Sequence, residues 1–301
     1  MSAESTLTRT DALFEVDRLG KVFDTRGGQV RAVDDVSFTV GRGETIGVVG
    51  ESGSGKSTVI RLMLRLQEPT SGRVVFDGTD LATIPSRRLG PVRRRMQMVF
   101  QNPYGSLLPH FSAVSNVAEP LRVHGIGTKS SRREEALRLL ELVGIGGRAA
   151  DLYPRQFSGG QQQRIAIARA LALEPDFLAC DEPTSSLDVS IQSQILNLVQ
   201  DVQRELSLTC VFVSHNLAVI ERVASRVLVM CRGRLVEMAP TDRLFGEPTH
   251  PYTKILLAAA LPIDGAEPIE SSVPDWDSTV LDKADASLVE IAPDHFVRIA
   301  Q

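Results

Sequence analysis

The sequence GESGSGKST at residues 50–58 limits the possible folds more than any other part of the chain. It fits the phosphate-binding pattern G-x-x-x-x-G-K-[ST] at every fixed position, with an apolar strand-like run before it and a helix-like run after it. Its glycines allow successive backbone N–H groups to turn inward around a phosphate. Lys56 would supply positive charge to the β- and γ-phosphate oxygens, and the Ser57 hydroxyl can ligate Mg²⁺. We therefore expect a strand, a loop and a helix that together bind the phosphates of a nucleotide.

Strand-like and helix-like segments alternate along most of the chain. The strand-like segments lie within residues 13–49 and at GRVVFDG, RMQMVF, FLACDEP, LTCVFVSH and RVLVMCRGRLVEMA. The helix-like segments are STVIRLMLRLQ, SRREEALRLLELVGI, QQQRIAIARALAL, SIQSQILNLVQDVQREL and NLAVIERVA. This alternation favours a parallel α/β core, and the mainly helical stretch predicts an insertion at about 105–170. After Pro262 the acidic, Pro- and Ser-containing sequence predicts an extended linker, followed by a small terminal hairpin at LVEIAPDHFVRIA.

Composition narrows the classes of function. The net charge of −4 gives no general attraction to nucleic acid or to an anionic membrane. The three cysteines are far apart and lie in apolar, β-like runs, which predicts buried inert thiols rather than a disulfide or a metal site. The first residues lack the apolar region of a signal peptide, and ILLAAALP is far shorter than the roughly 20 residues of a spanning helix. We expect the chain not to cross a membrane by itself.

Three further strand-like runs end in residues suited to nucleotide chemistry. Asp181 in CDEP is placed to bind Mg²⁺, and Glu182 after it could polarise an attacking water. His215 in SHN could hydrogen-bond the γ-phosphate, and the Gln101 amide in MVFQNP could reach Mg²⁺ or the water. Each has a structural alternative, namely an ordinary acidic strand end, a structural histidine or a capping glutamine. The phosphate-binding loop favours the functional interpretation of all of them.

A second anion-binding signal lies about a hundred residues after the first. In FSGGQQQR, residues 157–164, one polar residue and two glycines lead directly into a helix-like run. Free N–H groups and the helix dipole make such a helix N-terminus attractive to an anion. One mononucleotide does not need two phosphate sites so far apart in sequence, so the motif raises the question of whose phosphate it binds.

Taken together and in this order, these motifs resemble the nucleotide-binding subunit of an ABC transporter. The resemblance covers about residues 13–258: Walker A at 50–57, a Q-loop, the signature FSGGQ at 157–161, Walker B at 177–181, the D-loop SSLD and an H-loop histidine. It implies an α/β P-loop NTPase core with an N-terminal antiparallel β subdomain, a helical insertion and a small C-terminal extension. The implied domains are a flexible N-terminus at 1–12, the ATPase domain at 13–258 and the extension at 259–301.

The resemblance also assigns the site. It implies that two such domains pack head to tail, so that the signature of each holds the γ-phosphate of the ATP bound to its partner. The implied catalytic residues are Glu182, His215, Lys56 and Gln101, and the implied Mg²⁺ ligands are Ser57, Gln101 and Asp181. Phe23 would stack on the adenine, although a phenylalanine there could also belong to the core. The ATP contacts it implies are Phe23, Gly50, Glu51, Ser52, Gly53, Ser54, Gly55, Lys56, Ser57, Thr58, Ser158, Gly159, Gly160, Gln161 and Asp188.

A finer resemblance links the chain to the oligopeptide and dipeptide importers. VFQNPYGSL, DEPTSSLDVSIQSQILNL and EPTHPYTKILLAA look like this branch, and no cysteine follows Cys231, as in the type without a C-terminal cysteine cluster. Nickel and glutathione importers share these features. The positions that depart from the expected pattern are Phe157 in place of the commoner Leu, Leu108 and His110 in place of Asn and Arg, Asn216 in place of Asp, and Phe23 in place of the commoner Tyr.

The resemblance implies partners and a location as well. They are a second ATPase subunit, expected to be a different chain, two transmembrane permease subunits and, indirectly, an extracytoplasmic solute-binding protein, with no nucleic acid. The chain would lie on the cytoplasmic face of the membrane, bound through the permease. The alternative from another class is a soluble ABC ATPase without a transport role, which usually carries two such domains or a long coiled coil.

Overall fold

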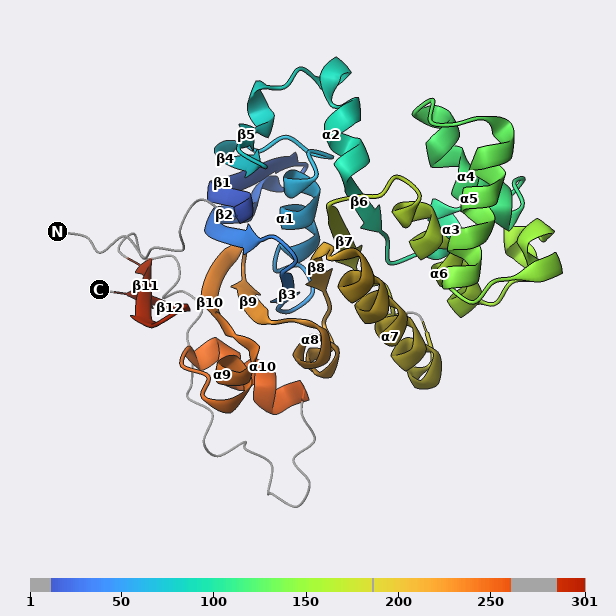
Figure 1. The fold of residues 1–301 in the computed structure, drawn as a ribbon. Helices are drawn as coiled ribbons and strands as arrows, with labels where there is room; N and C mark the ends of the chain where they lie inside the picture. Colours follow the sequence, from blue (N-terminus) through green and yellow to red (C-terminus); the bar gives the residue numbers. More distant parts are fainter. Residues whose placement is uncertain (1–11, 186, 261–285, 301) are drawn as a thin grey trace. The chain divides into compact units, whose positions relative to one another are not determined.

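The computed structural model describes residues 12–185, 187–260 and 286–300. Contacts divide the chain into two compact units (Figure 1): the parts up to Thr83 and from Val211 onward form the first, and Ile84–Cys210 forms the second. We describe each unit by itself. The predicted flexible N-terminus, apart from residue 12, and the predicted acidic linker lie outside the described residues. The domain boundaries at residues 13, 258 and 259 stay predictions.

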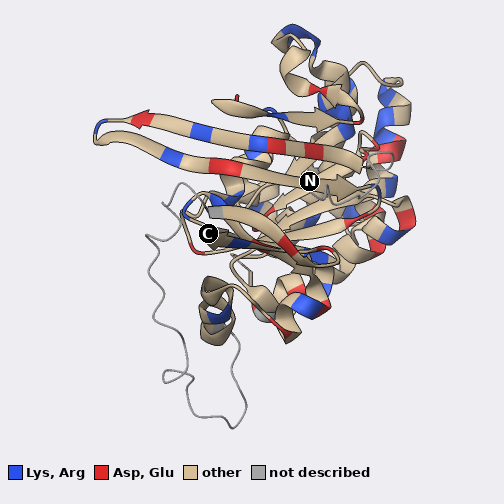
Figure 2. Cartoon of the chain, turned by 90° about the vertical axis from the view of Figure 1, so that its left-hand side faces the viewer, with Lys and Arg blue, Asp and Glu red and all other residues tan. Residues whose placement is uncertain are grey.

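The first unit contains an antiparallel sheet with strand order β2-β1-β4-β5. Apolar side chains on one face pack together, and the rings of Phe14 and Phe76 lie 4.9 Å apart between centroids. Figure 2 shows basic and acidic residues interspersed along the long β1–β2 hairpin. This sheet is the N-terminal antiparallel β subdomain that the sequence predicts. Its strands are β1 (Ala12–Thr25), β2 (Gly28–Gly41), β4 (Ser71–Phe76) and β5 (Thr79–Asp80).

A second sheet in the first unit has the order β11-β12-β10-β9-β3-β8. Strands β3 and β9 are parallel, whereas β9, β10, β12 and β11 pair antiparallel in succession. Arg232 and Gly233 both have positive φ (47° and 83°), as a tight primed turn between β9 and β10 requires. The predicted terminal hairpin is present as β11 and β12. The strands are β3 (Thr45–Val49), β8 (Thr209–Val213), β9 (Arg226–Cys231), β10 (Arg234–Pro240), β11 (Ala286–Ala292) and β12 (His295–Ala300).

Short helices accompany this second sheet. Gly47 shows how close one of them packs, because an added Cβ there would lie 2.4 Å from Ile220 Cγ2 of α8. The helices of the first unit are α1 (Lys56–Met63), the 3-10 turn η1 (Leu81–Thr83), α8 (Leu217–Val223), α9 (Thr241–Gly246) and α10 (Pro251–Ala260).

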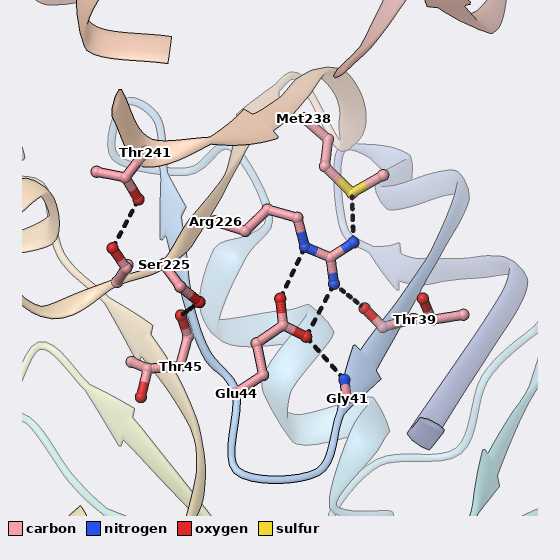
Figure 3. A network of polar contacts seen from close by, with 9 residues as sticks. Thr39, Gly41, Glu44, Thr45, Ser225, Arg226, Met238 and Thr241 are labelled. Carbon is pink, nitrogen blue, oxygen red and sulfur yellow. Dashed lines mark hydrogen bonds and ion pairs between the residues drawn. The ribbon is translucent and has the colours of Figure 1, made fainter. Parts of the chain in front are cut away.

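A partly buried ion pair joins the two sheets of the first unit (Figure 3). The Arg226 guanidinium at the start of β9 donates to both carboxylate oxygens of Glu44, at 2.9 and 3.0 Å, and to the Thr39 carbonyl of β2. Glu44 also accepts the Gly41 N–H at 2.7 Å. Bidentate geometry of this kind is among the stronger charge-assisted hydrogen bonds. It therefore fixes the end of β2 and the turn before β3 against the parallel strand β9.

The second unit combines a parallel strand pair with a group of helices. Strand β6 pairs in parallel with β7. Asn116, 0% exposed, bonds the carbonyls of Leu108, Phe111 and Ser112 and accepts the Leu108 N–H, which fixes the turn before α4. The elements are η2 (Ser86–Arg88), α2 (Gly90–Arg95), β6 (Met96–Val99), α3 (Pro103–Ser106), α4 (Ala113–Val123), α5 (Lys129–Leu142), η3 (Gly147–Asp151), η4 (Pro154–Gln156), α6 (Gly159–Leu171), β7 (Phe177–Asp181) and α7 (Val189–Leu206).

The cysteine prediction is confirmed. Cys180, Cys210 and Cys231 are all buried, and none of the three forms a disulfide. Burial raises the pKa of the Cys231 thiol to about 11 and also raises that of Cys180. Both thiols are therefore protonated and unreactive near neutral pH. Within the described residues, no helix is both long enough and apolar enough to cross a membrane.

Candidate nucleotide site

The loop between β3 and α1 has the geometry of a phosphate-binding loop. Gly50, Gly53 and Gly55 have φ angles of 146°, 81° and 101°, in the left-handed region that favours glycine. An added Cβ at Gly50 would lie 2.1 Å from the Met230 carbonyl oxygen, and one at Gly55 would lie 2.3 Å from that of Ala32. Gly50 and Gly55 are therefore required both by backbone conformation and by close approach of neighbouring backbone.

The side chain of Lys56 folds back into this loop. Its ammonium donates to the carbonyls of Gly50 at 2.8 Å and Glu51 at 2.7 Å, and approaches Ser54 Oγ at 3.5 Å. Only 5% of the residue is exposed, and a buried ammonium needs such acceptors to replace water. A nucleotide phosphate offers charged oxygens in place of these carbonyls.

The other predicted contacts of the loop are more open. Glu51, Ser52 and Gly53 are exposed, whereas Ser57 and Thr58 are half-buried in the first turn of α1. The backbone N–H groups of Ser57 and Thr58 lie at the positive end of the helix dipole, where an anion is stabilised.

His215 lies in the short segment that follows β8. Its side chain is exposed. Just before it, the Ser214 N–H reaches the Val48 carbonyl of β3 at 3.4 Å. Just after it, Asn216 Oδ1 accepts the Ala218 N–H at 3.1 Å and caps α8. The backbone on both sides of His215 is thus fixed, and Asn216 performs a capping role that asparagine fills as well as aspartate does.

Two adjacent carboxylates end β7 in the second unit. Asp181 is buried, with 5% exposed, whereas Glu182 is half-buried. Glu182 has φ 47°, a conformation that side chains other than glycine, asparagine and aspartate seldom adopt. Strained backbone of this kind is concentrated at functional sites.

Gln101 contacts Glu182 directly. Its Nε2 donates to Glu182 Oε2 at 3.0 Å and to Ser185 Oγ at 3.3 Å, although 81 residues separate Gln101 from Glu182. The capping alternative for Gln101 is wrong, because the residue that caps α3 is Asn102, whose Oδ1 accepts the Tyr104 N–H. Gln101 therefore holds the predicted catalytic carboxylate by hydrogen bonding.

The signature forms the N-terminus of α6. Ser158 is its N-cap: Ser158 Oγ accepts the Gln161 N–H at 3.3 Å, and Gln161 Oε1 accepts the Ser158 N–H at 3.0 Å. Gly160 is buried, and a Cβ there would lie 2.4 Å from Ile191 Cγ2, whereas a Cβ at Gly159 would meet nothing closer than 3.5 Å. The close packing of α6 on α7 requires glycine at position 160, whereas Gly159 leaves the end of the helix accessible.

The remaining predicted contacts are Phe23 and Asp188. Phe23 on β1 is half-buried, faces Val30 across the hairpin and has the Lys21 ammonium 5.1 Å from its ring centroid. Asp188 is the N-cap residue of α7, but its side chain accepts no capping hydrogen bond and is exposed. Phe23, the loop and His215 belong to the first unit, and the other predicted residues belong to the second.

The residues present suit Mg²⁺ and ATP. The predicted metal ligands offer a hydroxyl from Ser57, a carboxylate from Asp181 and an amide oxygen from Gln101. Oxygen donors of these kinds are the ligands that Mg²⁺ prefers. Glycine at residues 50, 53 and 55 puts no side chain beside the loop amides that would bind a phosphate.

Comparison with known proteins gives the family. The sequence profile described as "ABC transporter" matches residues 33–185, and the profile of the C-terminal region of oligopeptide/dipeptide transporters matches residues 236–280. The chain is 49% identical over 247 residues to a putative peptide import ATP-binding protein of Brucella ovis, covering 82% of this chain and 78% of that protein. This chain belongs to the ABC transporter family.

Other proteins of this family are also similar to the chain. The oligopeptide transport ATP-binding protein OppF of Bacillus subtilis is 45% identical over 294 residues, covering 96% of both chains. The glutathione import ATP-binding protein GsiA of Salmonella choleraesuis is 44% identical, covering 85% of this chain and 42% of that protein. Among solved structures, the dimeric ATP-binding cassette MJ0796 bound to ADP and Pi superposes with a TM-score of 0.69 at 30% identity, covering 76% and 98% of the two chains. The predicted ABC ATPase fold is confirmed.

Two contacts at the site were not foreseen. Ser185, within the predicted DEPTSSLD segment, accepts the Gln101 amide, and Tyr252, within HPYT, accepts the Glu51 N–H at 3.1 Å. Both residues stand in motifs that the sequence singled out. Neither motif by itself indicates which distant backbone or side chain these hydroxyls meet.

Proposed function

We propose that this chain is the ATP-hydrolysing subunit of an importer for di- or oligopeptides. The observation that carries the proposal is the hydrogen bond from Gln101 to Glu182, next to the buried Asp181, in a chain that also has an intact phosphate-binding loop. A degenerate subunit would have no need to keep a glutamate at this strained position with its carboxylate held in place.

The residues divide the chemistry among them. Lys56 exchanges its loop carbonyls for the β- and γ-phosphate oxygens, and the loop amides bind the same phosphates. Ser57, Asp181 and Gln101 would hold Mg²⁺, which neutralises charge on the phosphates when bound. Phe23 stacks on the adenine. The work of these residues is positioning and electrostatic stabilisation rather than covalent chemistry.

Glu182 acts as the general base. Its Oε2 accepts the Gln101 amide, so a water that replaces this amide would find an acceptor already oriented. His215, on the exposed segment after β8, holds the γ-phosphate and the water.

The signature acts on the partner's nucleotide. Ser158, Gly159, Gly160 and Gln161 place the N-terminus of α6 against the γ-phosphate of an ATP bound by a second ATPase subunit. Asp188 faces the same partner. Because each ATP then needs both subunits, ATP binding closes the dimer and hydrolysis releases it.

Peptide cargo is supported by the profile match at residues 236–280 and by the names of the relatives. The resemblance to GsiA keeps glutathione as a second candidate, and nickel is a third. Two permease subunits and, indirectly, a solute-binding protein complete the transporter, with this subunit on the cytoplasmic face of the membrane. The partner ATPase is expected to be a different chain.

The test is to purify the complex from membranes with this chain as bait and to measure its ATPase rate with candidate cargo. We expect permease subunits to copurify and di- or oligopeptides, together with the solute-binding protein, to raise the rate. Stimulation by glutathione or Ni²⁺ alone would replace the peptide assignment. A chain that copurifies with no membrane protein would overturn the transport role.

A further inference from the structure

One peptide group of the phosphate-binding loop is held from both sides. The N–H of Glu51 donates to the phenol oxygen of Tyr252 at 3.1 Å. The C=O of the same peptide group belongs to Gly50 and accepts the Lys56 ammonium at 2.8 Å. Because N–H and C=O point in opposite directions in a trans peptide, Tyr252 and Lys56 together fix the orientation of this plane.

Sterics alone would not fix that plane. Gly50 has φ 146° and carries no Cβ, so it has the widest choice of conformations of any residue. Rotation of the Gly50–Glu51 peptide would remove the carbonyl on which the Lys56 ammonium rests. The hydrogen bonds to Tyr252 and to Lys56 are therefore the contacts that select one orientation of the peptide.

Tyr252 is built to be a neutral hydrogen-bonding group. It is only 3% exposed, and burial raises its pKa to about 12. The phenol keeps its proton near neutral pH, and its hydroxyl also hydrogen-bonds Cys231 at the end of β9. An oxygen held in this way by a second partner is a well-oriented acceptor for the Glu51 N–H.

The start of α10, which carries Tyr252, is itself anchored by a buried carboxylate. The Tyr252 N–H donates to His250 Nδ1 at 3.1 Å, and Glu237, 0% exposed, accepts the N–H groups of Thr249 and His250 at 2.9 Å each. His295 Nε2 of the terminal hairpin lies 2.8 Å from the same carboxylate. A continuous buried chain of contacts thus runs from β12 through β10 to Tyr252.

We infer that Tyr252 is a positioning residue for the phosphate-binding loop, through which the HPYT segment of the C-terminal region sets the affinity for nucleotide. The inference rests on the proposed function, because it concerns the same ATP site. Tyr252 does not touch the reacting atoms. It acts by presenting the Gly50–Glu51 peptide and the Lys56 ammonium in one arrangement.

The test is Tyr252→Phe in the full chain, which removes the hydroxyl and keeps the ring. A hydrogen bond of this kind contributes a net 0.5–1.5 kcal/mol, so we expect the Kd for ADP and for a non-hydrolysable ATP analogue, each with Mg²⁺, to rise about threefold to tenfold. In the assembled transporter the KM for ATP should rise by a similar factor while kcat stays within about twofold. Tyr153→Phe removes a hydroxyl from a tyrosine that is 44% exposed and should change none of these values.

Hydrogen exchange distinguishes positioning from general stability. In the nucleotide-free chain, Tyr252→Phe should speed exchange of the Glu51 amide selectively, while the core strands β3 and β9 keep their protection. A lowered melting temperature with unchanged Kd and KM would overturn the inference and leave Tyr252 a packing residue. Wild-type chain that binds no ATP would instead overturn the proposed function, so the two failures are distinguishable.

Discussion

At the scale of single residues, the phosphate-binding loop is determined by conformations that only glycine adopts without strain. Gly55 is the residue before α1, with φ 101°, and a Cβ there would meet the Ala32 carbonyl oxygen at 2.3 Å. Strain and collision therefore act together at this position. Glu182 shows the opposite choice, because this proposed general base is a glutamate at φ 47°, a conformation that favours glycine.

Replacing Gly55 by alanine separates these two effects. We expect Gly55→Ala to lower the free energy of unfolding by more than about 2 kcal/mol, because it adds a backbone collision to the roughly 1–2 kcal/mol cost of a left-handed alanine. Gly78→Ala is the matched control, with φ 73° and no atom within 4 Å of the added Cβ. Urea unfolding measures the free energy of unfolding of both variants. Equal losses in the two variants would show that the loop yields to the added methyl group.

Another prediction concerns the pH dependence of stability through His250. Burial lowers the pKa of this histidine from 6.5 to about 4 in the folded chain. The unfolded chain therefore takes up a proton near pH 6.5 that the folded chain refuses until about pH 4, so acid favours unfolding. From pH 7.5 to pH 5 we expect about 2 kcal/mol of stability to be lost through this group.

The measurement is the free energy of unfolding as a function of pH. His250→Asn should flatten the curve between pH 7.5 and 5, because an asparagine oxygen can still accept the Tyr252 N–H without titrating. His124→Gln, at an exposed histidine, should leave the slope unchanged. A slope that persists in His250→Asn would assign the acid sensitivity to another group.

At the scale of elements, the N-terminus of α6 is accessible enough to test the signature. A Cβ added at Gly159 would lie 3.5 Å from Leu187 Cδ2, which is ordinary van der Waals contact. The helix dipole stabilises an acidic residue in the first turn of a helix. Gly159→Asp should therefore fold normally. Its negative charge would repel the γ-phosphate of the partner's ATP.

We expect Gly159→Asp to abolish ATP hydrolysis in the assembled transporter while the isolated subunit binds ATP as before. Ser130→Asp places the same charge in the first turn of α5, at an exposed residue, and should not affect hydrolysis. Loss of ATP binding by the isolated Gly159→Asp subunit would place the signature in the chain's own site, against the proposed dimer.

Most of these elements could be predicted because their signals are local. The apolar spacing around α6, the strand ending at Asp181 and the hairpin turn at Arg232-Gly233 all lie within short windows. The contacts between distant elements could not be predicted in the same way. The bond from Tyr252 to Glu51 spans 201 residues and depends on how α10 packs, which no local pattern encodes.

At the scale of the whole molecule, the comparisons confirm the family and the fold that the motifs predicted, from the loop at residue 50 to the C-terminal HPYT segment. The first unit contains the phosphate-binding loop and the described part of the C-terminal region, and the second contains the proposed general base and the signature. The proposed hydrolysis uses residues of both units, and the signature is proposed to serve a second subunit.

The steady-state ATPase rate of the Glu182→Gln variant in the assembled transporter is the decisive measurement of the role proposed for Glu182. Removing a general base costs typically 10²–10⁴-fold in rate, so we expect turnover to fall by at least about a hundredfold while ATP stays bound in a closed dimer. Glu205→Gln, at an exposed glutamate of α7, is the matched control and should keep the wild-type rate. A rate near the wild-type value in Glu182→Gln would contradict the role of Glu182 as the base.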